Sequence, residues 1–157
     1  MIADIVLDTN VLVHAENPAE QRCEASRCLL QRMLLVDTHL CVDEGFHLIE
    51  AMNRSRISSE YLGHLRFGSM GFAVVAQLAA AGRIKVLSPK PGAAVAKRIR
   101  QLIRNTTDRV FLAVSYASNE KLLVSHDYVD FQETKRETLR REFGVAVIEA
   151  CVCNPRL

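Results

Sequence analysis

Short apolar runs rich in β-branched residues alternate with longer amphipathic segments along the chain, and this alternation restricts the fold more than any other feature. The runs that predict strands are residues 5–7, 40–42, 84–87, 122–124 and 145–148. The segments that predict helices are residues 10–15, 19–35, 45–53, 59–66, 72–81, 93–104, 108–118 and 133–143. Strands that alternate with helices favour an α/β fold, because parallel strands are joined by helices that cover both faces of the sheet. We therefore expect a three-layer α/β/α architecture with a central parallel sheet of four to five strands.

The chain of 157 residues has the length of one domain, and no linker, repeat or low-complexity segment divides it. We expect a single domain over residues 1–157. No apolar run reaches the roughly 18 residues that a membrane span requires, and the opening residues MIADIVLDTN lack the basic region of a signal peptide. The five cysteines are an odd number, which argues against a disulfide framework. Together these features predict a cytoplasmic protein without membrane association.

Charge is distributed unevenly, although the net charge is only +2. Residues 1–60 carry ten acids and five bases, whereas residues 61–157 carry eight acids and fifteen bases. The densest basic segment, residues 83–109, contains eight bases and a single acid, Asp108. Such a stripe can attract phosphate groups, although the stripe alone is explained more simply by a solvated helix face.

Two acidic residues stand where expected strands end. Asp8 closes the first strand, and Asp127 follows the fourth strand in the segment LLVSHD. Because functional groups collect at the carboxyl ends of strands in open parallel sheets, both side chains should stand at the same edge. Asp108 begins an expected helix after a turn signal, and Glu50 lies on the flank of the expected helix 45–53.

Each of these acids has a structural explanation when it is considered alone. Asp8 could cap a helix, Asp108 could lie favourably in a first helical turn, and Asp127 could start a turn. Glu50 could simply face water. As a set they indicate more, because clustered carboxylates raise one another's pKa values and a divalent cation relieves the repulsion. An all-oxygen ligand set favours Mg²⁺ or Mn²⁺ over zinc.

Three segments resemble motifs of the PIN domain family. They are VLDTNVLV (6–13), TDRVFLAVSYA (107–117) and LLVSHDYVDF (122–131). The resemblance covers nearly the whole chain, in the family's order. It implies that Asp8, Asp108 and Asp127 are metal ligands at the catalytic site, and that Asn10 and Ser125 support them through hydrogen bonds.

The resemblance also implies a second acidic position. Some PIN proteins carry a segment similar to D-x-x-G-x-I-x-x-E-Y, and Asp43, Gly45 and Glu50 in VDEGFHLIEAM resemble it. On this match Glu50 is the fourth metal ligand and Asp43 supports the site. The chain departs from the pattern at Ala51, where tyrosine is usual, and has one fewer residue between Asp43 and Gly45. Glu44 is therefore a competitor for the same role.

The family resemblance implies a metal-dependent ribonuclease, because members include RNA-processing factors and toxins of type II toxin–antitoxin pairs. A divalent cation held by the four acids would activate water and neutralise charge on the phosphate during hydrolysis. Asp130 could join the site through water. We expect Arg104 and Arg109 to flank the site and to contact the RNA backbone.

The same resemblance suggests partners besides RNA. An antitoxin protein is one, and a second copy of the chain in a homodimer is another. The apolar segment 72–81 could serve such a dimer, although an ordinary core helix explains it equally well.

Two other interpretations compete with the nuclease. Phosphatases of the haloacid dehalogenase type also open with an aspartate after the first strand, but their D-x-D motif needs an acid where Asn10 stands. A non-catalytic PIN-like module would bind nucleic acid or a protein without cleaving anything. The presence of all four acids argues against that module but does not prove turnover.

Overall fold

The computed structural model describes residues 1–157 and contains one sheet of five strands in the order β3-β2-β1-β4-β5. The strands are β1 (Asp4–Leu7), β2 (His39–Asp43), β3 (Ile84–Leu87), β4 (Leu122–Val124) and β5 (Ala146–Ile148). Every neighbouring pair is parallel. This confirms the predicted α/β fold and its central parallel sheet.

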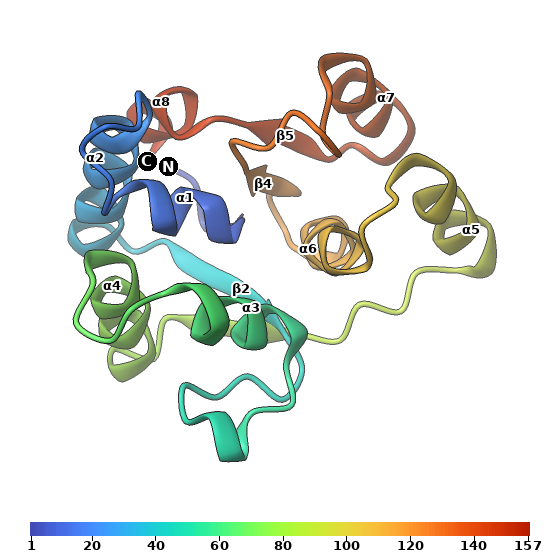
Figure 1. Cartoon of the computed structure of the whole chain (residues 1–157). Helices are drawn as coiled ribbons and strands as arrows, with labels where there is room; N and C mark the ends of the chain where they lie inside the picture. The colour runs from blue at the N-terminus through green and yellow to red at the C-terminus, as the bar shows by residue number, and fades with distance from the viewer.

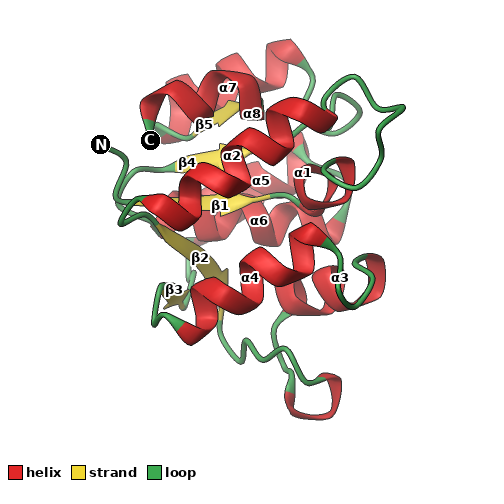
Figure 2. Ribbon diagram, turned by 90° about the vertical axis from the view of Figure 1, so that its left-hand side faces the viewer, coloured by secondary structure: helices red, strands yellow, loops and turns green.

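Helices cover both faces of the sheet and complete the three layers. They are α1 (Thr9–His14), α2 (Cys23–Leu35), α3 (Arg56–His64), α4 (Met70–Ala80), α5 (Ala93–Leu102), α6 (Thr106–Ala117), α7 (Glu133–Phe143) and α8 (Ala150–Cys153). Two short 3-10 turns, η1 (Glu50–Met52) and η2 (Asn154–Arg156), complete the elements. Figures 1 and 2 show α1, α2, α4 and α8 on one face, with α5, α6 and α7 on the other. Helix α3 contacts both α1 and α6.

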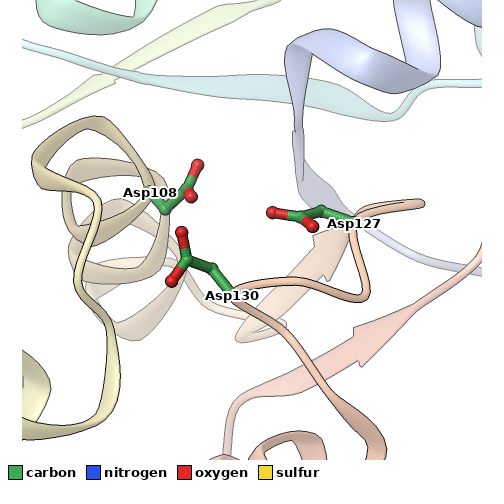
Figure 3. A group of neighbouring side chains, drawn as sticks. All are labelled: Asp108, Asp127 and Asp130. Carbon is green, nitrogen blue, oxygen red and sulfur yellow. The ribbon is translucent and has the colours of Figure 1, made fainter.

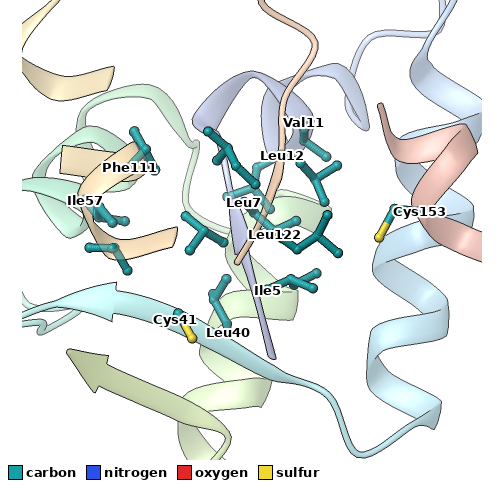
Figure 4. Close-up of a cluster of buried hydrophobic side chains, with 14 of the residues drawn as sticks. Ile5, Leu7, Val11, Leu12, Leu40, Cys41, Ile57, Phe111, Leu122 and Cys153 are labelled. Carbon is teal, nitrogen blue, oxygen red and sulfur yellow. The ribbon is translucent and has the colours of Figure 1, made fainter. Parts of the chain in front are cut away.

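The central strand β1 is buried along its whole length and forms the middle of the hydrophobic core. Figure 4 shows Ile5 and Leu7 of this strand among apolar side chains of the two helix layers. Leu12 comes from one layer and Phe111 from the other, and both are buried. Full burial of one such side chain contributes about 1.5–3 kcal/mol. The core therefore holds the strand ends, and whatever follows them, in fixed positions.

One expected helix is not formed. Residues 45–53 make an exposed excursion after β2 that contains only the short turn η1. Gly45 has a φ of +80°, a left-handed conformation that starts a turn and not a helix. The side chain of Asn53 accepts hydrogen bonds from the main-chain amides of His47 and Ser55, which closes the excursion. Local bonds of this kind compete with helix formation.

Helix α4 buries Val74, Val75 and Leu78 in the chain's own core, so its apolar character is explained without a partner. None of the helices combines the length and the apolar character that crossing a bilayer demands.

Candidate metal centre

The acidic residues gather where the strand connections diverge. The connection after β1 leads to β2 on one side, and the connection after β4 leads to β5 on the other. Such a switch point opens a crevice at the carboxyl ends of the two strands. Leu7 pairs with Val124, and the main-chain N–H of Asp8 donates to the Val124 carbonyl at 2.9 Å. Asp8 and Asp127 therefore stand at the same edge of the sheet, as the strand pattern predicts.

Asp8 is the most deeply buried acid of this edge, with 5% of its surface exposed. Its Oδ2 accepts hydrogen bonds from Oγ of Ser125 at 2.6 Å and from Nδ2 of Asn10 at 2.8 Å. Ser125 Oγ also accepts from the main-chain N–H of Asp127 at 3.0 Å, and Asn10 Oδ1 accepts from that of His126 at 3.0 Å. Ser125 and Asn10 thus join the ends of β1 and β4. Burial raises the pKa of Asp8; the Ser125 hydrogen bond lowers it, and the charge of Asp127 raises it.

Asp108, Asp127 and Asp130 form a compact group beside Asp8. One oxygen from each carboxylate lies within 4.8 Å of the others, and Figure 3 shows the three side chains turned toward one another. Asp108 comes from the first turn of α6, which Asn105 caps by accepting two main-chain N–H bonds. Asp127 and Asp130 come from the loop between β4 and α7.

Electrostatic repulsion within the group is concentrated on Asp108. Burial raises its pKa to about 8, together with a hydrogen bond to Asp130 and the negative charges of Asp8, Asp127 and Asp130. The Asp108 carboxyl therefore retains its proton at neutral pH unless positive charge enters the group. Three carboxylates in this arrangement can hold a metal ion.

A further acid, Glu60 of α3, lies at the same edge. Glu60 and Asp8 both line a pocket of about 300 Å³. Oε1 of Glu60 is 3.4 Å from the hydroxyl of Thr107, the residue that precedes Asp108. Glu60 therefore lies near Asp8 and beside the first turn of α6, which carries Asp108.

Sequence reasoning missed Glu60, although a signal for it was present. The pattern I-x-x-E-Y, which the excursion matches only in part around Glu50, occurs intact at residues 57–61 as ISSEY. Tyr61 has a clear structural role: its buried hydroxyl donates to the Leu7 carbonyl at 2.6 Å. This bond fixes α3 against the end of β1 and so places Glu60 beside Asp8.

The residues expected at the second acidic position lie elsewhere in the structure. Glu50 lies on the exposed η1 turn, which stands off the body of the molecule in both views (Figures 1 and 2), and the fold does not bring it to the acid group. Glu44 is also exposed. Asp43 accepts a bond from the Ser55 hydroxyl at 2.5 Å and from two main-chain amides of the first turn of α3 at 2.7 and 3.1 Å. Asp43 therefore supports the site indirectly, by anchoring the helix that carries Glu60.

The two arginines expected to contact RNA differ in their surroundings. Arg104 is exposed, and its main-chain N–H lies 3.4 Å from Oδ1 of Asp130. Nε of Arg109 donates to the Ile103 carbonyl at 2.7 Å, which ties α6 to the end of α5. Only Arg104 combines an exposed side chain with a direct link to the acid group.

Two histidines lie beside the acids, and one of them, His14, lines the same pocket as Asp8. Nδ1 of His126 is 2.9 Å from Nδ1 of His14, and Nε2 of His126 accepts the main-chain N–H of Ala150 at 3.3 Å. Since Nε2 is an acceptor, the proton of neutral His126 sits on Nδ1 and is donated to His14. Burial and the proximity of His14 together lower the pKa of His126 to about 4, so the ring is neutral at pH 7.

The residues at this edge fit a hard cation. Every charged donor is a carboxylate oxygen, the ligand type that such ions bind. Both side-chain hydrogen bonds to the Asp8 carboxylate are made to Oδ2. The neighbouring hydroxyl of Thr9 is buried without a hydrogen-bond partner, and Thr9 lines the same pocket as Asp8. An unsatisfied hydroxyl beside repelling carboxylates is a feature that a bound ion and its water would resolve.

No model of a known protein family matches the chain, and no curated protein is significantly similar to it in sequence.

Proposed function

We propose that the protein is a nuclease that uses Mg²⁺ or Mn²⁺ to hydrolyse phosphodiester bonds, with RNA as the substrate. The observation that carries the proposal is the group of Asp108, Asp127 and Asp130 beside Asp8 at the switch point, with its raised Asp108 pKa. These four residues and Glu60 are the candidates to hold the ion. Such an ion supplies an activated water and neutralises charge on the phosphate.

The chain's own residues provide the placement that this chemistry needs. Ser125 donates to the Asp8 carboxylate and accepts the main-chain N–H of Asp127, and so fixes the segments after β1 and β4 relative to each other. Asn10 fixes Asp8 and the main chain of His126 in the same way. Partners of this kind orient ligands and are worth about 10- to 100-fold in metal affinity or activity.

The substrate strand has a natural path along α1. The 300 Å³ pocket beside Asp8 adjoins a second depression of about 410 Å³, and the two share Val13 and His64. The second depression is also lined by the exposed base Arg66. One end of the path therefore lies at the acids and the other beside a base that can contact a phosphate.

The resemblance of three segments to PIN domains supports RNA as the substrate. It also extends the proposal to a toxin-like role, in which an antitoxin protein is a partner, and to a homodimer. The alternative of a binding module without catalysis makes a distinct prediction, because that module would retain RNA binding and lack metal-dependent cleavage.

The test compares four proteins on a labelled single-stranded RNA: wild type, Asp8→Asn, Glu60→Gln and Glu50→Gln. Wild type should cleave with Mn²⁺ and not with EDTA. Asp8→Asn and Glu60→Gln should each lower the rate at least about 100-fold, since even the partners of metal ligands are worth about 10- to 100-fold. Glu50→Gln is the matched control and should cleave like wild type, because the exposed η1 turn lies off the site.

Three results would contradict the proposal or part of it. Cleavage that survives EDTA or Asp8→Asn argues for a contaminating nuclease. Binding without cleavage supports the non-catalytic module. A lowered cleavage rate in Glu50→Gln, together with a wild-type rate in Glu60→Gln, would assign Glu50 as the fourth ligand.

A further inference from the structure

Arg136 of α7 is buried, with 7% of its surface exposed, and its guanidinium donates to main-chain carbonyls and not to carboxylates. Burying a charged group is costly unless its hydrogen bonds are satisfied, so a buried arginine with this bonding pattern has a specific structural task. The acceptors identify that task.

Three of its four acceptors lie in the loop that carries the site acids. Nε donates to the Phe131 carbonyl at 2.8 Å, and one terminal nitrogen donates to the carbonyls of Ser125 at 3.2 Å and Asp127 at 3.0 Å. The other terminal nitrogen donates to the Val147 carbonyl of β5 at 3.3 Å. One guanidinium therefore connects the beginning, the middle and the end of segment 125–131, and joins that segment to the sheet.

The ring of Tyr128 covers the guanidinium, with its centroid 4.1 Å from the Arg136 Cζ atom. Tyr128 belongs to the segment 125–131, so this segment contacts the Arg136 guanidinium both through its carbonyls and through the tyrosine ring. A cation placed over an aromatic face in this way is attracted to it. Asp127 and Asp130 are thereby presented from a segment that is fixed at both ends.

We infer that Arg136 is a positioning residue for the candidate metal centre: it holds the segment 125–131 in the shape that brings Asp127 and Asp130 to Asp108. The inference rests on the proposed function, since it assumes that these acids hold a cation. The guanidinium opposes, through these four bonds, the repulsion that drives the carboxylates apart. Lysine cannot replace it, because an ammonium has three donors and lacks the planar fork that reaches four separate carbonyls.

Arg83 provides a matched control. It also donates to main-chain carbonyls, those of Met33, Leu34 and Val36 at the end of α2, and it precedes β3, so it lies at the amino edge of the sheet, opposite the acids. Arg136→Lys and Arg83→Lys therefore remove the same kind of bonding, and only the first change touches the site loop.

The experiment measures Mn²⁺ affinity of the full chain by titration with electron paramagnetic resonance detection, and melting temperature in EDTA. Both lysine variants should melt below wild type. Arg136→Lys should weaken Mn²⁺ binding about 10- to 100-fold, as loss of a supporting partner does, whereas Arg83→Lys should stay within about twofold of wild type. Tyr128→Leu keeps every hydrogen bond of Arg136 and should weaken Mn²⁺ binding a few-fold; it decides the question if Arg136→Lys does not fold.

Each outcome has a distinct meaning. Mn²⁺ affinity that is unchanged in Arg136→Lys, or in Tyr128→Leu when Arg136→Lys is unfolded, overturns the positioning role and leaves the proposed function intact. Equal loss of affinity in Arg136→Lys and Arg83→Lys also overturns it, because the effect then follows stability alone. A wild-type protein that binds no Mn²⁺ overturns both the inference and the proposed function.

Discussion

Asp108 is the residue whose pKa is raised by burial and by the charges of the other acids of the candidate site. It lies on α6, and burial raises its pKa to about 8 together with acids that come from the end of β1 and from the β4–α7 loop. With no cation bound, the proton retained on Asp108 can be donated to Asp130, which relieves part of the repulsion. The protonation state of this one carboxyl therefore links pH, metal binding and stability.

The first prediction is that the metal-free protein loses stability as pH rises from about 4 to about 8. The unfolded carboxyl has a pKa near its ordinary value of 3.8, while the folded one titrates near 8. Between these values the folded state binds the additional proton, so raising the pH favours unfolding. Melting temperature in EDTA, measured from pH 5 to pH 9, should fall by a few degrees in wild type. Asp108→Asn should show a flatter profile, and an identical profile would mean that Asp108 is not the responsible group.

The junction between α5 and α6 shows how an element can bring basic residues to the site. The apolar side chains Val95, Ile99, Leu102 and Ile103 pack against the protein core or form part of it. Lys97, Arg100 and Arg104 are left exposed. Nε of Arg109 bonds to the last turn of α5 and orients this basic surface relative to Asp108.

The second prediction separates the two arginines of this junction. Arg104→Ala should weaken binding of many RNAs alike and reduce the salt slope by about one, without changing the melting temperature. Arg109→Ala should lower the melting temperature, because it removes a bond that holds α5. A titration of one labelled RNA at several salt concentrations measures the slope. If the slope is the same in Arg104→Ala and wild type, the exposed arginine is only part of a solvated helix face.

In the molecule as a whole, the candidate site joins four segments that are distant in sequence. They are the end of β1, helix α3, the start of α6 and the β4–α7 loop. A cation bound among them would require all four to be in place at once. Its binding free energy would therefore add to the stability of the entire fold.

The third prediction is a large thermal shift. Mn²⁺ at about 100 times its dissociation constant should stabilise the fold by about 2.7 kcal/mol, which raises the melting temperature by roughly 5–10 °C in a domain of this size. The shift should be larger at pH 8 than at pH 6, since the acids must lose their protons to bind. Asp8→Asn should show little shift, yet melt no lower than wild type in EDTA, because it removes one repelling charge. A sharp drop for this variant in EDTA would assign Asp8 a structural role.

The sequence by itself determined features that depend on local pattern. Strands 84–87 and 122–124 and helix 133–143 were predicted at their observed bounds, and α7 ends at Gly144 with a φ of +70°. Asp8 and Asp127 could be placed at one edge because each follows an apolar run that predicts a strand. The carboxyl ends of parallel strands lie at the same edge of a sheet. The prediction of a helix at residues 45–53 was wrong. The spacing of the apolar residues favours a helix there, but the Asn53 side chain accepts main-chain hydrogen bonds from His47 and Ser55 that close a loop.

Tertiary structure alone decided which acids meet and what holds them. Glu60 reaches the crevice because Tyr61 donates a hydrogen bond to the end of β1, 54 positions away in the chain. Glu50 lies on the exposed η1 turn, away from the crevice. Arg136 and Asp127 are nine positions apart, yet no periodicity indicates that a guanidinium of α7 folds the loop around itself. The local sequence pattern indicates which face of an element is buried. It does not indicate which distant element covers that face. In this protein the packing between distant elements assembles the site.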